Sequence, residues 1–308
     1  MSSLHLRSVP MGLWQVILAA ALWGTIGIAT QNIYDTEPVN SLFLNLMRTS
    51  LATPILILAC RRVVGPGMFR IPRRDVAVMA FAGSILAISH ASYFAAIRYS
   101  GVTISTLLAI GVSPMIVSAA SVLMKRERFT GRVGIALAAS LIGSALLVGL
   151  NPEMMEFTNL PLGIFFSLLA AASYAGMIMA GRQLANRYHP LQTTAVMFIA
   201  GSIVLLVVNL FSGLTIPHMP QTWLSIAYLA VVPTAIAYFL LHMALRTLPG
   251  TIASMASVLE AVVAALLAWW LFGESLTLTS MAGAALLLFG LAILSWKPEQ
   301  LAIAGSAP

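Results

Sequence analysis

Charged residues are scarce in this chain. Only 8% of its 308 residues are Asp, Glu, Lys or Arg, whereas a typical soluble domain has about 25%. Hydrophobic residues make up 60% of the chain, and the mean hydropathy is +0.96. A soluble domain of this length cannot hide that much apolar surface in its own core. The composition therefore excludes a soluble globular protein and predicts a polytopic membrane protein.

Cysteine and metal-binding clusters are lacking as well. Cys60 is the single cysteine, so no intrachain disulfide can form and redox chemistry is not the organising theme. His90 and His242 lie far apart, with no second ligand one turn away, so we expect no metal site. The sequence contains no G-x-x-x-x-G-K-[ST] phosphate loop for an ATPase. Because no nucleophile is plausibly paired with a base, we expect neither an enzyme nor a cofactor.

Long apolar runs are abundant. A helix needs about 20 apolar residues to cross the hydrocarbon core. Polar breaks separate ten such runs, at residues 11–30, 39–60, 75–95, 102–124, 132–150, 161–181, 190–211, 221–243, 250–272 and 278–296. Strands of a membrane barrel would be about half as long and would alternate in polarity, so these runs predict helices. No small-residue cleavage site ends the first run, which we expect to be retained.

Positive charge is distributed unevenly among the predicted loops. With the N-terminus in the cytoplasm, 14 of the 16 basic residues fall on the cytoplasmic side: Arg7, Arg61, Arg62, Arg70, Arg73, Arg74, Lys125, Arg126, Arg128, Arg132, Arg182, Arg187, Arg246 and Lys297. Cytoplasmic loops of membrane proteins carry this excess, so we expect both termini in the cytoplasm. The same distribution explains the isoelectric point of about 10.1 without a nucleic-acid partner.

The two halves of the sequence are similar to one another. AIRYSGVTI (96–104) is similar to ALRTLPGTI (244–252), and GLWQVILAAALWGT (12–25) is similar to GIFFSLLAAASYAG (163–176). Five spans per half is an odd number, so the second half must enter the membrane from the opposite side. Inverted repeats of this kind are typical of transporters with a site near the midplane. We predict one five-helix repeat at 11–150, an inverted one at 161–297 and a cytoplasmic tail at 298–308.

Several of these features together resemble a known family. They are the ten spans in two repeats, the ALWG of the first span, the arginine in the second span, the spacing from Pro114 to Glu127 and the LE pair at 259–260. Over residues 11–297 the chain resembles the drug/metabolite transporter superfamily, EamA type. Within that group it looks most like the YddG-type exporters of aromatic amino acids. Ala261 departs from the pattern, because a proline is common there.

The resemblance implies a secondary transporter of the inner membrane. It would export amino acids, aromatic or hydrophobic ones above all, or related small metabolites, by alternating access and without ATP hydrolysis. An uncoupled facilitator or channel, and a multidrug-type exporter of other amphipathic molecules, remain alternatives. The expected partners are a small-molecule substrate and the lipid bilayer, and the expected state is a monomer.

Two ionisable residues, Arg48 and Glu260, lie near the middle of predicted spans. Each costs about 2.5–3.5 kcal/mol there on insertion scales, and such residues are functional by default. They either face the carboxylate and the ammonium of an amino acid, or pair and lock the helices together. Asn45, one turn before Arg48, is a candidate hydrogen-bond partner for it. Ser254 and Ser257 extend a polar stripe with Glu260 that should face a water-filled cavity.

Aromatic and imidazole side chains mark further candidate positions. They are Trp23, His90, Tyr93, Tyr174, Tyr238 and His242. Those that are three or four residues apart share a helix face, and matching positions in the two halves should approach one cavity from opposite sides. Aromatic walls with a few polar groups suit a small amphipathic ligand, and plain helix packing is the alternative. His90 is either a hydrogen-bonded bridge between helices or a proton relay.

The remaining candidates concern helix breaks and helix ends. Pro114 lies within the fourth run and frees a backbone carbonyl, so it marks either a gating hinge or a static kink. Glu127 and Glu274 lie beyond their spans, where they can stay solvated as helix-end or lid residues. Asp75, which follows two arginines, is interpreted as a helix N-cap.

Overall fold

The structure, a computed structural model, describes residues 11–149, 158–212, 216–273 and 277–296. Within these ranges the chain is all-helical, as the apolar runs predict. The elements in chain order are α1 (Met11–Gly24), α2 (Ile26–Thr36), α3 (Ser41–Val64), α4 (Arg73–Thr106), the π-helix η1 (Leu107–Gly111), α5 (Ser113–Leu123), α6 (Gly131–Val148), α7 (Leu160–Leu184), α8 (Pro190–Ser212), α9 (Pro220–Ala230), the π-helix η3 (Val231–Ile236), α10 (Ala237–Ala244), α11 (Gly250–Ser257), α12 (Leu259–Phe272) and α13 (Leu278–Ser295). Glu274 and the predicted tail at 298–308 lie outside the described residues.

Nine helical stretches of the described chain are long and apolar enough to cross a membrane. The predicted runs 75–95 and 102–124 share one 51-residue stretch, Arg73–Leu123, and each other predicted run has a stretch of its own. Inside the shared stretch the helix is broken at Gly101, which has a φ of 73° and a ψ of 169°. A positive φ of this kind favours glycine, because glycine has no Cβ to clash.

Side chains cap several helices where polar breaks interrupt the apolar runs. Asn40 accepts the backbone N–H of Leu42 at 2.9 Å at the start of α3. Thr130, Asn159 and Thr277 cap α6, α7 and α13 in the same way. Each cap satisfies a backbone donor that the first turn of a helix leaves unpaired. The polar breaks therefore start the next helix as well as ending the previous one.

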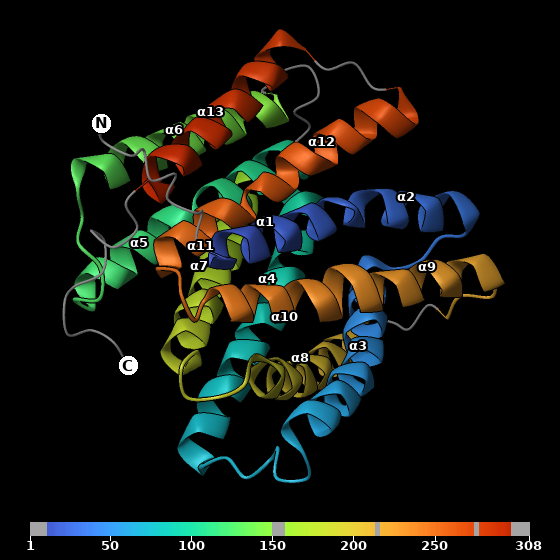
Figure 1. Cartoon of the computed structure of the whole chain (residues 1–308). Coiled ribbons are helices and arrows are strands. Elements are labelled where there is room, and N and C mark those ends of the chain that lie inside the picture. Colours follow the sequence, from blue (N-terminus) through green and yellow to red (C-terminus); the bar gives the residue numbers. More distant parts are fainter. Residues whose placement is uncertain (1–10, 150–157, 213–215, 274–276, 297–308) are drawn as a thin grey trace, which may run out of the picture.

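The helices cross most closely at glycines. Figure 1 shows α6 and α13 lying along each other at one edge of the molecule, and a Cβ on Gly143 would lie 2.8 Å from the carbonyl oxygen of Gly283. At the crossing of α4 and α8, a Cβ on Gly83 would lie 1.9 Å from the carbonyl oxygen of Met197. Membrane helices approach this closely only where the side chain is small.

Four of the membrane-length stretches are irregular near their middle. Thr25 separates α1 from α2, and Val258 separates α11 from α12. The π-helix η1 precedes α5, and the π-helix η3 joins α9 to α10. Pro114 lies in the first turn of α5, directly after η1, where a missing backbone donor costs nothing. Breaks and π-turns of this kind often mark hinges, and the gating role of Pro114 stays a prediction.

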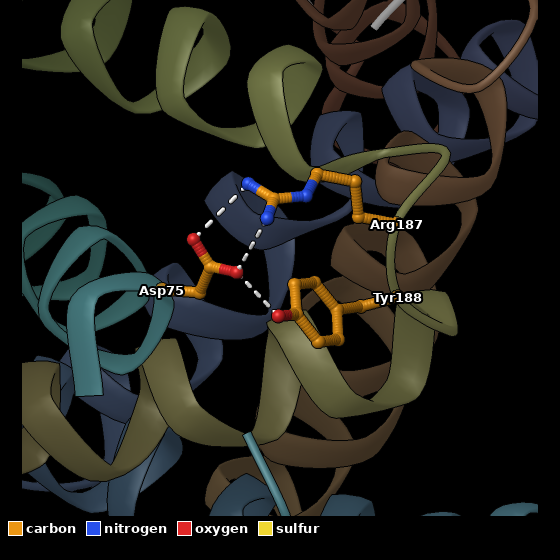
Figure 2. A network of polar contacts seen from close by, with 3 residues as sticks. All are labelled: Asp75, Arg187 and Tyr188. Carbon is orange, nitrogen blue, oxygen red and sulfur yellow. Dashed lines mark hydrogen bonds and ion pairs between the residues drawn. The ribbon is translucent and has the colours of Figure 1, made fainter. Parts of the chain in front are cut away.

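Asp75 is not the helix N-cap that the sequence suggested. The helix α4 begins at Arg73 with Pro72 as its N-cap, and Asp75 is already inside the first turn and 3% exposed. Its carboxylate accepts from Nη1 and Nη2 of Arg187 at 3.1 and 3.0 Å, and from the hydroxyl of Tyr188 (Figure 2). The two arginines before it, which suggested an exposed helix end, are not its partners.

Glu127 also differs from the expectation. It lies beyond the end of α5, as predicted, but it is 8% exposed and not solvated. Its Oε1 accepts the backbone N–H of Thr251 at 3.4 Å, which ties the α5–α6 connection to the start of α11. The sequence concealed this contact, because the two residues are 124 positions apart.

Candidate ligand-binding cavity

A cavity of about 540 Å³ lies between helices from both halves of the chain. Its walls come from α1, α2, α3, α4, α5, α7, α9, α10, α11 and α12 and from the π-helix η1. At one end it reaches the exposed side chains of Gln31, Tyr34 and Val102. At the other end it stops at α11, all of whose residues are buried. The cavity is therefore open toward one side of the molecule and closed toward the other.

Arg48 on α3 lies in the cavity wall and is 7% exposed. Its Nη2 donates to Nε2 of His90 on α4 at 3.3 Å. Asn45 is not its partner, contrary to the expectation, because the Asn45 amide donates to the carbonyl oxygen of Ser41 at 3.1 Å. The Nε of Arg48 is buried without a protein partner in the described chain, which leaves it a strong donor at the wall.

His90 bridges three helices at the cavity wall. Besides the bond from Arg48, its Nε2 lies 3.4 Å from the hydroxyl of Tyr238 on α10. Because a guanidinium can only donate, Nε2 must accept from Arg48, and the ring proton is then on Nδ1. The Tyr238 ring packs edge-on against Trp23 at 5.1 Å and against Phe198 at 5.2 Å. The bridging interpretation of His90 thus has a geometric basis.

Glu260 lines the same cavity from the first turn of α12. Ser254 and Ser257 line it from α11, so the predicted polar stripe does face a cavity. Both hydroxyls donate to carbonyl oxygens of their own helix, at 3.0 Å each. Glu260 and Arg48 are close enough to interact electrostatically, but they form no ion pair. One acid and one base therefore share the chamber without neutralising each other directly.

Tyrosines complete the aromatic part of the wall. Tyr93 on α4 has its hydroxyl 2.7 Å from Oγ1 of Thr106, and Tyr174 contributes from α7. Together with Trp23 and Tyr238, the four predicted aromatic positions all line the cavity. Aromatic faces with a small number of fixed polar groups are the usual lining of small-molecule sites.

His242 does not line the cavity, contrary to the expectation. It is 2% exposed, its Nδ1 lies 2.8 Å from the carbonyl oxygen of Tyr238, and it also lies 3.3 Å from Oγ1 of Thr194. Helical spacing correctly put His242 on the same face as Tyr238. Four residues, however, correspond to about 6 Å along the helix axis, and the cavity ends before that turn.

Several lining residues were missed by the sequence reasoning. They include Gln31, Phe94, Thr106 and Ser113. Ser113 occupies the place in the first half that Glu260 occupies in the second, so the repeat was a usable signal for it. Thr106 had no such signal, because it reaches Tyr93 only after the chain turns at Gly101. Within the described ranges, no three His, Cys, Asp or Glu side chains gather where they could hold a metal ion.

The comparison with known sequences gives a consistent result over nearly the whole chain. The sequence model of the EamA-like transporter family matches residues 10–149 and again residues 161–296. A transporter of Archaeoglobus fulgidus is 29% identical over 291 residues, which cover 94% of this chain and 98% of the relative.

Two bacterial proteins are similar over comparable lengths. The transporter YwfM of Bacillus subtilis is 27% identical over 297 residues, covering 92% of this chain and 94% of that protein. The inner membrane transporter YicL of Salmonella typhimurium is 27% identical over 292 residues, covering 94% and 96%. A crystal structure 18% identical in sequence matches 95% of this chain and 99% of its own with a TM-score of 0.82, so the fold is shared.

Proposed function

The chain belongs to the EamA-like transporter family and is a multi-pass membrane protein, and on that premise we propose that it exports amino acids across the inner membrane. The favoured substrates are aromatic or hydrophobic amino acids, as for the YddG-type exporters that the sequence resembles, or related small metabolites. The mechanism we propose is secondary transport by alternating access through the central cavity. The family and its relatives are transporters, which makes an enzyme unexpected.

We propose ten spans in two inverted repeats, at 11–150 and 161–297, with both termini cytoplasmic. A straight helix as long as Arg73–Leu123 would measure about 75 Å, more than twice the hydrocarbon thickness. The break at Gly101 supports two crossings in that stretch. The separate matches of the family to residues 10–149 and 161–296 support the two repeats. The name of the Salmonella relative supports the inner membrane.

One observation carries the proposed substrate class: a base and an acid share one aromatic-lined chamber of about 540 Å³. That volume is within the range of small-molecule sites. Arg48, with a donor left unpaired, suits a carboxylate, and Glu260 suits an ammonium. The aromatic walls suit the apolar or aromatic side chain of such an amino acid: Trp23, Tyr93, Tyr174 and the ring of Tyr238.

Other residues are proposed to position Arg48, to line the cavity or to allow its helices to move. His90 orients the Arg48 guanidinium through the contact at 3.3 Å, and Tyr238 holds the His90 ring through its own contact with Nε2 at 3.4 Å. Asn45 and Ser257 add polar lining. Pro114, next to the π-helix η1, is the proposed hinge of the first half. We propose no metal and no cofactor, and a monomer as the transporting unit.

Uptake into proteoliposomes tests the proposal. Labelled tryptophan, phenylalanine and a drug cation would be compared, with and without a pH gradient. Arg48→Ala should weaken the binding of tryptophan about tenfold or more, and should affect tryptamine, which lacks the carboxylate, far less. Arg98→Gln is the matched control, because Arg98 is exposed and lies outside the cavity wall.

The outcomes separate the alternatives. If no amino acid is transported, the proposed substrate class is wrong. If only the drug cation is transported, a multidrug-type exporter is favoured. Flux that ignores both the pH gradient and Glu260→Gln would indicate an uncoupled facilitator. Asp35→Asn is the control for Glu260→Gln, because Asp35 is exposed and lies outside the cavity wall.

A further inference from the structure

The short helix α11 separates the cavity from the closed side of the protein. Ser254 and Ser257, in its second half, line the cavity. Gly250, at its other end, would bring a Cβ to 3.3 Å from Cγ1 of Val117 and 3.6 Å from Cγ2 of Ile178. All eight residues of α11 are buried, between α1, α5, α7 and α13. The helix α11 therefore lies between a ligand in the cavity and the closed side.

The first turn of α11 is held by a carboxylate from the other half of the chain. Its N-cap is Pro249, which supplies no side-chain acceptor. Glu127 provides one instead, because its Oε1 accepts the N–H of Thr251 at 3.4 Å. A negative charge at this position also complements the helix dipole. Glu127 is 8% exposed and follows the end of α5, so the contact ties α11 to that end of α5.

A second tie holds the loop that precedes α11. Nη1 of Arg182, near the end of α7, donates to the carbonyl oxygen of Leu245 at 2.8 Å and lies 3.5 Å from that of Arg246. Arg182 also interacts electrostatically with Glu127. The guanidinium of Arg182 therefore holds the loop 245–249. The carboxylate of Glu127 holds Thr251, which follows that loop in α11.

The other end of α11 has a joint. Val258 interrupts the α-helix between α11 and α12, and the backbone there makes three-residue turns, from Val258 N–H to Met255 O at 3.2 Å and from Ala261 N–H to Val258 O at 3.1 Å. A change of dihedral angles at one such position can swing a short helix while the long one stays in place.

We propose that α11 is the gate of the closed side, that Glu127 and Arg182 hold it shut, and that Val258 is its hinge. The inference rests on the proposed alternating access and adds to it the element that moves. Glu127 and Arg182 act as positioning residues, because they hold α11 and do not line the cavity.

Accessibility of a cavity residue from each side tests the gate without any substrate. The reporter is Ala261→Cys, a half-buried cavity position, in a Cys60→Ser background. A membrane-impermeant maleimide is added to right-side-out and to inside-out vesicles. We expect labelling from the open side in the parent protein. Glu127→Ala and Arg182→Ala should each speed labelling from the closed side about three- to tenfold, because each removes one tie on the shut state.

Two further variants keep the test decisive. Gly250→Ala places a methyl group 3.3 Å from Cγ1 of Val117. We expect this crowding between α11 and α5 to speed closed-side labelling without removing a charge. Arg128→Gln removes an exposed cation next to Glu127 and should change nothing. Equal closed-side rates in the parent, Glu127→Ala, Arg182→Ala and Gly250→Ala would overturn the gate. If the parent transports amino acids but the variants label at the parent rate, the gate proposal is wrong and the substrate proposal stands. If the variants label faster but no amino acid is transported, the substrate proposal is wrong and the gate proposal stands.

Discussion

The buried charge of Asp75 is paired by residues that lie far along the chain. Asp75 is 3% exposed, and both of its partners, Arg187 and Tyr188, belong to the connection between α7 and α8. The hydrogen bond to Asp75 raises the pKa of Tyr188, because the neighbouring carboxylate disfavours a phenolate. The network holds the start of α4 to the end of α7.

Asp75→Asn should lower the stability of the protein by about 2 kcal/mol, because it leaves Arg187 and Tyr188 without their charged acceptor. Arg187→Gln should cost less, because the Arg187 side chain is 51% exposed and water can take its place beside Asp75. Thermal unfolding in detergent measures both. Arg74→Gln, an exposed arginine beside Asp75, is the control. An Asp75→Asn protein that unfolds at the control temperature contradicts the assignment.

Glu37, which is not buried, is likewise held by residues from far along the chain. Its carboxylate accepts the backbone N–H groups of His218 at 2.9 Å and Met219 at 3.1 Å, just before α9. The His218 N–H, with further help from Thr222 and Met219, holds the pKa of Glu37 below its ordinary value. The charged form is therefore favoured in the folded state.

This depressed pKa predicts a dependence of stability on pH. The contribution of Glu37 is complete above the ordinary pKa of a glutamate, about 4.3, and is lost as the pH falls through the lower folded value. Glu37→Gln should therefore unfold at a lower temperature than the parent at pH 7, and the difference should shrink below about pH 4. A difference that stays constant between pH 7 and pH 3 would contradict the role of the charge.

At the scale of elements, the closest helix crossings depend on glycines, which have no side chain to keep the backbones apart. The α4–α8 crossing at Gly83 and the α6–α13 crossing at Gly143 and Gly283 both bring backbones into contact. The irregular segments at η1, η3, Thr25 and Val258 have the opposite effect, because they weaken individual helices next to the cavity. The helices are thus packed tightly at their glycine crossings, and the irregular segments lie around the cavity.

Gly83→Ala should destabilise the protein by about 3 kcal/mol or more, because the new methyl group cannot fit beside the Met197 carbonyl without separating two helices. Gly134→Ala is the matched control. Its Cβ would meet only the Phe129 ring, at 3.6 Å, and alanine favours a helix. Equal unfolding temperatures of the two variants would show that the close crossing is not needed for stability.

At the scale of the whole molecule, the central question is how often the chain crosses the membrane. The stretch Arg73–Leu123 contains the break at Gly101. Both of its parts contact α7, but α4 also packs against α8, whereas α5 also packs against α11. Crossing twice there would return the chain to the side from which it came.

Single cysteines in a Cys60→Ser background measure this topology. We expect Arg70→Cys and Arg128→Cys to react with an impermeant maleimide from the cytoplasmic face, and Arg98→Cys from the opposite face. All three positions are exposed. Labelling of residue 98 from the cytoplasmic face would show that the stretch Arg73–Leu123 does not cross the membrane twice, which would contradict the ten-span arrangement.

The class of the protein and the positions of its helices followed from the sequence. In hydrocarbon, every backbone donor must be satisfied within its own segment, so an apolar run of about 20 residues has little choice but to be a helix. The family resemblance, which the match to the EamA-like transporter family confirms, followed from residue patterns such as ALWG and the spacing from Pro114 to Glu127. The inverted repeat stays a prediction. Arg48 and Glu260 were visible because an ionisable group inside a span is costly.

Contacts between distant segments were decided only by the tertiary structure. Helical spacing tells which face a side chain is on but not how deep the cavity reaches, so Tyr238 lines it and His242, one turn farther, does not. Nor does local sequence tell which helix meets which, so the pairing of Asp75 with Arg187 and of Glu127 with Thr251 could not be foreseen. These bonds depend on how the helices pack, and packing joins residues more than a hundred positions apart.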